Sequence, residues 1–146
     1  MTPVVRCATP ADAEHCERLE AEVRNNNAGA RGAEAFFAEQ PIGFLVGADA
    51  GFSLVAEVDS VIVGYITVLL TQVLTDRIAT VARVYVTARA RRVGVGDALI
   101  TFAKNTAREQ KCSRIDALAL PGDRDTKNLY ERNGITARLI VATTKL

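Results

Sequence analysis

Three consecutive runs rich in β-branched residues dominate the middle of this sequence. They cover Phe52–Val58, Val61–Gln72 and Arg77–Thr87, and they predict strands because β-branched side chains pack well on a pleated surface. Only Asp59 and Ser60 separate the first two runs, which predicts a two-residue hairpin. The chain is therefore expected to fold around an antiparallel sheet.

Alternation along the third run predicts which of its side chains share a face. Successive side chains of a strand point to opposite faces, and here both faces are mostly apolar, which predicts a central strand covered on both sides. The first face would hold Ile78, Thr80, Ala82, Val84 and Val86, and the second Ala79, Val81 and Tyr85.

Helical patterns surround these strands. Thr9 can cap a helix whose first position is Pro10, and apolar residues at helical spacing extend this helix to about Arg24. The same rules predict a strand at 4–8, a short helix at 33–39, a loop at 40–51, a helix from 95, a strand at 114–120, a helix at 123–133 and a strand at 136–145. The chain is thus predicted to be of the α/β (α+β) class, a single domain over residues 1–146 with a mixed sheet flanked by helices.

Composition excludes several classes of protein. The 146 residues are 49% hydrophobic and 24% charged, as in a globular protein rather than a disordered one. The longest apolar run, Val61–Leu70, is about half a membrane span, and the first residues lack the pattern of a secretory signal. Three cysteines and one histidine form no close group, so we expect no disulfide framework and no metal site, and a cytoplasmic location without membrane attachment.

Charge is distributed unevenly although the net charge is only +1. Residues 1–76 carry eleven acids and four arginines, whereas residues 77–146 carry fourteen cations and six acids. Five arginines and no acid lie between Arg77 and Gly96, which favours an anionic ligand; the alternative is that arginine is simply the preferred solvated cation here. A nucleic-acid partner is disfavoured, because the chain is nearly neutral and only Tyr85 is interleaved with these arginines.

The segment Arg-Arg-Val-Gly-Val-Gly-Asp-Ala-Leu at residues 91–99 joins the third strand to the next helix. The first turn of a helix has unpaired N–H groups and the positive end of the helix dipole. Gly94 and Gly96 would let these amides face a phosphate, and Arg91 and Arg92 would add charge from the rim. The alternative is an ordinary tight strand-to-helix turn, because two glycines alone are a weak signal.

Two motifs in this order resemble those of one family. Arg91-x-x-Gly94-x-Gly96, directly after an apolar strand, resembles the acyl-CoA-binding motif of the GNAT N-acetyltransferase family. Residues 123–135 resemble that family's Asn-x-x-Ala-x-x-Leu-Tyr-Glu-x-x-Gly-Phe helix, and the opening at residues 6–12 is similar as well. The likeness spans essentially the whole chain. It implies a mixed, mostly antiparallel sheet of six to seven strands flanked by about four helices.

The resemblance also implies a site. Acetyl-CoA, as co-substrate, would place its pyrophosphate on the amides of residues 93–97 and its pantetheine along the strand ending at Val86, whose N–H would be the oxyanion donor. Tyr130 stands where the family places its general acid, which protonates the departing sulfur. The residues implied for acetyl-CoA are Val84, Tyr85, Val86, Arg91, Arg92, Val93, Gly94, Val95, Gly96, Asp97 and Asp123.

The implied activity is transfer of an acetyl group from acetyl-CoA to a primary amine by direct attack, with no metal. A small molecule or a protein could supply that amine. The alternatives are a non-catalytic acyl-CoA-binding regulatory module and, for Tyr130, a merely packed aromatic. A homodimer formed through the last strand is a further expectation.

The sequence departs from the family's pattern at several positions. Arg92 replaces a frequent glycine, Asp123 replaces the asparagine before the last helix, and Arg83 takes the outward position near which the family often has a glutamate base on the central strand. Glu57 and Asp76 are the remaining candidates for a base, and neither is assigned.

Overall fold

The computed structural model of the protein describes residues 2–47 and 49–146. Met1 and Ala48 lie outside the described residues, Ala48 within the loop predicted for residues 40–51.

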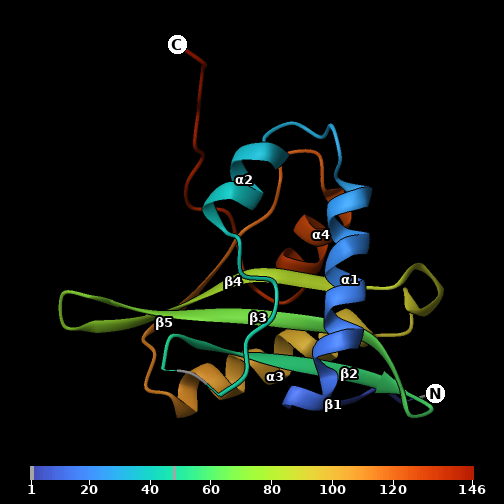
Figure 1. The fold of residues 1–146 in the computed structure, drawn as a ribbon. Coiled ribbons are helices and arrows are strands. Elements are labelled where there is room, and N and C mark those ends of the chain that lie inside the picture. The colour runs from blue at the N-terminus through green and yellow to red at the C-terminus, as the bar shows by residue number, and fades with distance from the viewer. Residues whose placement is uncertain (1, 48) are drawn as a thin grey trace.

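A five-stranded sheet forms the centre of the described structure (Figure 1). Its strands lie in chain order: β1 (Val4–Cys7), β2 (Gly51–Val58), β3 (Val61–Val73), β4 (Asp76–Val86) and β5 (Arg114–Ala117). The first four strands pair antiparallel, and β5 pairs parallel to β4. The predicted hairpin at Asp59 and Ser60 is confirmed, and both residues have positive φ (51° and 66°), as a two-residue turn with the twist of the sheet requires.

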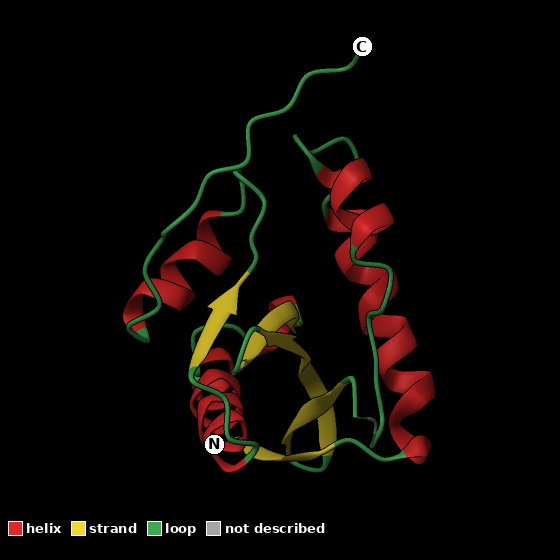
Figure 2. Ribbon diagram, turned by 90° about the vertical axis from the view of Figure 1, so that its left-hand side faces the viewer, coloured by secondary structure: helices red, strands yellow, loops and turns green. Residues whose placement is uncertain are grey.

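Helices cover both faces of this sheet (Figure 2). One face packs against α1 (Ala13–Asn26) and α2 (Ala33–Glu39), and the other against α3 (Val95–Glu109) and α4 (Arg124–Arg132). The larger core cluster lies on the α3 face, where Leu99, Ile100 and Ala103 are fully buried against the strands. The mixed sheet with four flanking helices confirms the predicted fold class.

A β-bulge interrupts β4 next to the point where β5 leaves it. Thr67 of β3 pairs with Arg83, but Val68 pairs with Val81, so Ala82 is an extra residue on β4. The last paired residues of β4 and β5 are Val81 and Ala117. A bulge commonly ends a ladder and re-aims the following side chains, and here the second half of β4 continues without β5 beside it.

Because of the bulge, the predicted assignment of β4 side chains to the two faces of the sheet is wrong after Ala82. Before it, Ala79 and Val81 belong to the core on the α3 face; after it, Val84 and Val86 pack against that same core. Tyr85 instead packs against the cluster on the α1 face. One inserted residue reverses the parity of a strand whose side chains alternate, and it therefore turns Arg83 and Tyr85 toward α1.

The strand predicted at residues 136–145 is also wrong. These residues are extended and exposed, with no strand pairing, and Figure 1 shows the C-terminal segment leaving the body of the molecule. Arg138 forms an ion pair with Asp116 of β5 at 2.9 Å, but Leu139, Ile140 and Val141 remain exposed. β-Propensity alone does not make a strand without a neighbouring backbone to pair with, so the described sheet has five strands instead of the expected six to seven.

Within the described residues, no helix combines the length and the apolar character needed to cross a bilayer.

Asp12 connects the start of α1 to the sheet. Its carboxylate accepts hydrogen bonds from both terminal nitrogens of Arg6 at 2.8 and 2.9 Å and from the Thr9 backbone N–H at 2.8 Å. The bonds from Arg6, opposed by burial and helped by Thr9, lower the pKa of Asp12 to about 2 from an ordinary value of 3.8. The stabilisation is therefore present above the unfolded pKa and is lost as the pH falls toward 2.

We expect Asp12→Asn to lower the free energy of unfolding at pH 7 by up to about 2 kcal/mol, since one pKa unit corresponds to about 1.4 kcal/mol. The variant should also lose stability less steeply than the wild type between about pH 5 and pH 2. Urea denaturation at a series of pH values measures both effects. Glu14→Gln, at an exposed acid of the same helix, is the control; identical pH slopes for Asp12→Asn and wild type would contradict the assignment.

Candidate active site

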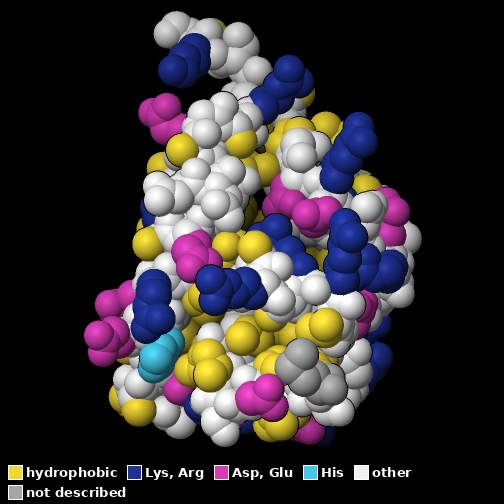
Figure 3. Space-filling view, turned by 90° about the vertical axis from the view of Figure 1, so that its right-hand side faces the viewer, with side chains coloured by type: hydrophobic (Ala, Val, Ile, Leu, Met, Phe, Trp, Pro, Cys, Tyr) yellow, Lys and Arg dark blue, Asp and Glu magenta, His cyan; other side chains and the backbone are white. Residues whose placement is uncertain are grey.

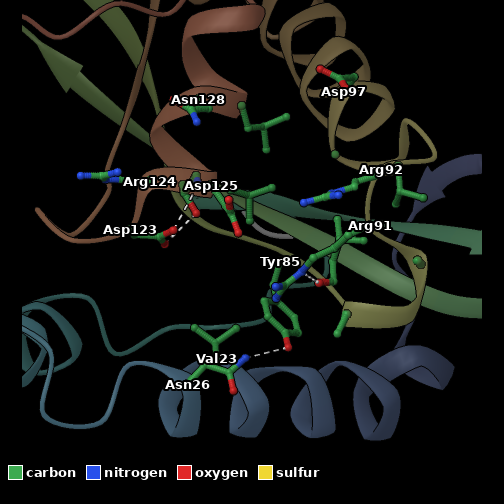
Figure 4. Close-up of a pocket in the computed structure, with 18 of the residues that line it drawn as sticks. Val23, Asn26, Tyr85, Arg91, Arg92, Asp97, Asp123, Arg124, Asp125 and Asn128 are labelled. Atoms are coloured by element: carbon green, nitrogen blue, oxygen red, sulfur yellow. Dashed lines mark hydrogen bonds between the residues drawn. The ribbon is translucent and has the colours of Figure 1, made fainter.

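An open cleft of about 1340 Å³ lies where β5 separates from β4. It is bounded by the end of β4, the arginine-rich loop at residues 87–94, the start of α3, the start of α4 and the last turn of α1 (Figure 4). Figure 3 shows the hollowed face of the molecule, with Lys and Arg side chains gathered beside the hollow. Among the residues predicted for acetyl-CoA, those that line the cleft are Val84, Tyr85, Val86, Arg91, Arg92, Gly94, Val95, Gly96, Asp97 and Asp123; Val93 does not.

The second half of β4 presents main-chain groups to the cleft. Thr87 N–H donates to the Val63 carbonyl at 2.8 Å, and Tyr85 opposes Tyr65 in the same register. Residues that bond to a neighbouring strand alternate along an antiparallel pair, so the N–H and C=O groups of Val84 and Val86 point away from β3. The Val86 carbonyl accordingly accepts a bond from Arg91 Nε at 3.0 Å. An extended ligand could add to this edge as a strand would.

The start of α3 supplies amides to the same cleft. Gly94 precedes the helix with φ of 82°, a left-handed conformation that glycine adopts without strain. The Ala98 N–H donates to the Gly94 carbonyl at 3.0 Å as the first bond of the helix. The N–H groups of Val95, Gly96 and Asp97 therefore precede the first intrahelical donor, and this geometry suits an anion.

Gly96 serves packing rather than ligand access. A Cβ at this position would come within 3.1 and 3.2 Å of the two methyl carbons of Leu129 on α4. A Cβ at Gly94 would meet nothing within 4 Å. The two glycines of the motif thus have different roles: Gly94 shapes the backbone at the cleft, and Gly96 lets α4 approach the first turn of α3.

The Asp97 carboxylate points toward the C-terminal end of α4. It accepts a bond from Asn133 Nδ2 at 2.9 Å and pairs with Arg132 at 3.3 Å. Burial alone would favour the neutral acid, but the hydrogen bonds from Asn133 and Arg132 outweigh it and hold the pKa of Asp97 below its ordinary value. The negative charge in the first turn of α3 is thereby partly neutralised.

Arg91 and Arg92 are both exposed and line the cleft (Figure 4). The Arg91 guanidinium also lies 5.6 Å from the centre of the Tyr85 ring. Arg92 has φ of 68°, the left-handed conformation that favours the glycine this position often has in the family.

Asp123 caps α4 and faces the cleft from the opposite side. Its carboxylate accepts bonds from the backbone N–H of Thr126 at 3.1 Å and from the Thr126 hydroxyl at 2.7 Å. The sequence offers Asp123 or Asp125 as the cap of the helix predicted at 123–133, and the structure shows that the cap is Asp123. Thr126, which stands where the family has alanine, supplies one of the bonds that hold the carboxylate in place.

Tyr130 lies on α4 with only 6% of its surface exposed. Its hydroxyl donates to the Leu118 carbonyl at 2.8 Å, directly after β5 ends. Burial, with a smaller contribution from Asp123, raises the pKa of Tyr130 above its ordinary value, so the phenol is protonated at neutral pH. Tyr130 itself is not among the described residues that line the cleft, although its neighbour Leu129 is.

The prediction that Arg83 occupies an outward position on the strand is wrong. Arg83 is 3% exposed, and its Nε donates to both carboxylate oxygens of Glu20 on α1 at 2.8 and 3.1 Å. Its other nitrogens donate to the carbonyls of Ala82 and Gln40. The guanidinium also lies 5.1 and 4.8 Å from the ring centres of Phe36 and Phe37. Sequence reasoning missed this pair because its members are 63 positions apart.

The carboxylates considered as bases occupy other places. Glu57 pairs with Arg6 at 2.9 Å, at the β1 side of the sheet, and Asp76 begins β4 at the hairpin end opposite Val86. The cleft instead contacts the last turn of α1 through Val23, Asn26 and Asn27. These three residues follow one another at i, i+3 and i+4, so they share one helical face. This spacing is the sequence signal that could have indicated that they line a common surface. No group of histidine, cysteine or acidic residues within 2–47 and 49–146 could hold a metal ion.

We expect Arg92→Gly to raise the free energy of unfolding by roughly 0.5–1 kcal/mol. A non-glycine residue in the left-handed region destabilises the folded state by about 1–2 kcal/mol. Glycine removes this strain, but its greater conformational freedom in the unfolded chain offsets part of the gain in stability. Arg89→Gly, at an exposed position with ordinary backbone geometry, should instead lower stability. Guanidinium denaturation compares the two, and a loss of stability in both variants would contradict the strain at Arg92.

Comparisons with known proteins agree with this architecture. No curated protein matches the chain at the level of sequence. Among solved structures, a ribosomal-protein-alanine N-acetyltransferase from Brucella melitensis biovar Abortus 2308 is 24% identical, covers 99% of each chain and has a TM-score of 0.76. A structure described as a transcriptional regulator from Bacillus halodurans C-125 is 23% identical, covers 99% of this chain and 100% of its own, and has a TM-score of 0.77.

A third structure, AAC(6')-Iy in complex with the bisubstrate analog CoA-S-monomethyl-acetylneamine, is 16% identical, covers 100% of both chains and has a TM-score of 0.73. These likenesses concern the fold. A model of the acetyltransferase (GNAT) family matches residues 33–135, which include the bulged strand, the arginine-rich loop, α3 and α4. The chain therefore belongs to the GNAT acetyltransferase family.

Proposed function

We propose that this protein transfers the acetyl group of acetyl-CoA to a primary amine by direct attack of the amine on the thioester. The observation that carries this proposal is the cleft in which an anion corner, at the start of α3, adjoins the free edge of β4. The pyrophosphate of acetyl-CoA fits the corner by charge, and the amides of pantetheine fit the strand edge by hydrogen bonding. The structural neighbour AAC(6')-Iy, with its CoA-containing analog, supports this assignment.

Each part of the cleft would then have a role. Arg91, Arg92 and the first amides of α3 hold the diphosphate, and the Val84 and Val86 main chain orients the pantetheine. The Val86 N–H would donate to the thioester oxygen as negative charge develops there. Tyr130 would protonate the departing sulfur, for which its hydroxyl must turn from the Leu118 carbonyl toward the cleft.

A second candidate is a non-catalytic acyl-CoA-binding regulatory module. Arg83 favours it, because an arginine paired with Glu20 occupies the strand on which a base is often found in this family. Both candidates would bind acetyl-CoA, but only the transferase would release CoA in the presence of an amine. An acetyl-CoA titration followed by a panel of amines, with the released CoA detected by a thiol reagent, separates binding alone from transfer.

We expect Arg91→Gln to weaken acetyl-CoA binding about tenfold, since one charge-assisted hydrogen bond contributes roughly 1.5 kcal/mol. Isothermal titration calorimetry measures this change. Arg89→Gln is the matched control: Arg89 is exposed on the same loop but does not line the cleft. Equal affinities for both variants and the wild type would count against the anion corner.

We expect Tyr130→Phe to lower kcat by at least about tenfold, because a positioned general acid typically contributes 10²–10⁴-fold. The affinity for acetyl-CoA should remain within about twofold, since the phenol would act only as the sulfur departs. Steady-state CoA release and calorimetry measure the two quantities on the same preparation. An unchanged kcat would assign Tyr130 a packing role only.

A further inference from the structure

Asp97 places a negative charge at the start of α3, where the proposed function requires an anion site. A helix N-terminus that binds a phosphate offers N–H groups and positive potential, yet the first turn of α3 carries this carboxylate. Asp97 lines the cleft and lies on the same wall as Arg92 (Figure 4). Its side chain is 44% exposed, so packing in the core does not account for it. The role of the acid must therefore lie in what its carboxylate contacts.

The shortest contact of Asp97 is with Asn133, the residue that follows α4. Asn133 Nδ2 donates to Asp97 Oδ1 at 2.9 Å and to the Leu129 carbonyl, within its own helix, at 2.8 Å. An amide nitrogen has two N–H donors, so both have an acceptor here. The bonds from Arg132 to Asp97 are longer, 3.3 and 3.4 Å, and join exposed groups, so they contribute less.

A second residue of α3 also binds Asn133. Lys104 lies seven positions after Asp97, about two helical turns along the same face, and its Nζ donates to the Asn133 carbonyl at 2.7 Å. Asp97 therefore binds the side chain of Asn133, and Lys104 binds its main chain. These two bonds hold the C-terminal end of α4 against α3.

The end of α4 is also the part of the helix that carries the phenol. Tyr130 precedes Asn133 by three residues, and the Asn133 N–H donates to the Tyr130 carbonyl at 3.0 Å. Because both residues belong to one hydrogen-bonded turn, a shift of Asn133 would move Tyr130 with it. A misplacement of about 1 Å can slow a reaction 10²-fold. The bond between Asp97 and Asn133 thus contributes to the position of the Tyr130 hydroxyl.

The same carboxylate opposes binding of the acetyl donor. The hydrogen bonds from Asn133 and Arg132 hold the pKa of Asp97 below its ordinary value, so it is ionised at neutral pH. The diphosphate of acetyl-CoA would lie on the N–H groups of residues 95–97, and a like charge on one of these residues weakens its binding. Asp97 also pairs with Arg132, which lines the cleft, and so offsets part of that positive charge.

We propose that Asp97 is a positioning residue that holds the Tyr130 helix through Asn133 and thereby lowers the affinity for the anionic acetyl donor; this rests on the proposed transferase function. One side chain then affects two quantities in opposite directions. Loss of its charge strengthens donor binding, whereas loss of its hydrogen bond slows the transfer step. An acid that only stabilised the fold would, when removed, weaken binding and slow transfer together.

The binding test uses two substitutions in the whole chain. Asp97→Asn removes the charge but keeps an oxygen that can accept from Asn133, whereas Asp97→Ala removes both. At low ionic strength, Asp97→Asn should bind acetyl-CoA about three- to tenfold more tightly than wild type, and high salt should reduce the difference. Asp97→Ala should bind at least as tightly as wild type. Glu109→Gln, at an exposed acid in the last turn of α3, is the matched control and should leave the affinity unchanged; calorimetry measures all four proteins.

The transfer test separates the hydrogen bond from the charge. Transfer to n-propylamine is followed in single turnovers with the protein in excess over acetyl-CoA, so that release of CoA does not enter the rate. Asp97→Ala should lower this rate about tenfold, and Asp97→Asn should recover most of the loss. Amide hydrogen exchange of residues 124–132 should be faster in Asp97→Ala than in Asp97→Asn, a readout that requires no turnover.

Tighter binding by Asp97→Asn, together with slower transfer and faster exchange in Asp97→Ala, supports the proposal. Unchanged or weaker binding by Asp97→Asn overturns it, and so do equal exchange rates in the two variants. Equal transfer rates in the two variants overturn it as well, where the wild type transfers. A wild-type protein that binds acetyl-CoA but acetylates no amine of the panel overturns the transferase function instead. The binding and exchange measurements still report on Asp97 in that case, so the two failures are distinguishable.

Discussion

The β-bulge at Ala82 is the constraint on which the arrangement of the cleft depends. It lies beside the last residue of β4 that pairs with β5, and it reverses the parity of the residues that follow. Without it, Arg83 and Tyr85 would face the apolar core on α3, and Val84 and Val86 would face the acidic helix α1. One inserted residue therefore separates the two strands and places the polar side chains of β4 on the face where α1 can pair with them.

The buried Arg83 shows how a charge is accommodated on that face. Removing an arginine and a glutamate from water costs several kcal/mol per ion. Here the cost is offset by two bonds to Glu20, by backbone carbonyls at Ala82 and Gln40, and by two aromatic rings. The same contacts hold α2 and the loop after it against α1 and the sheet.

Local patterns predicted most of the elements, whereas the errors concern features that depend on distant partners. Capping at Thr9 and Asp123, the hairpin at Asp59 and Ser60, and the glycine corner at residue 94 are set by neighbouring residues, and these were predicted. The bulge at Ala82 has no local signal, because it depends on the register with β3. The segment at 136–145 has the composition of a strand but no strand beside it. Within the site, the loop and α4 were anticipated, but the contribution of α1 was not.

The contact between Gly96 and Leu129 has a mechanical consequence for any donor bound in the cleft. Leu129 fixes α4 against the first turn of α3, and the next residue, Tyr130, carries the phenol beneath the end of β5. Adjacent residues of α4 thus contact the start of α3 and carry the phenol. Under the proposed function, the distance between the anion corner and the Tyr130 phenol selects the length of the thioester donor. A donor with a shorter arm between its phosphate and its thioester could reach the anion corner or the phenol, but not both at once.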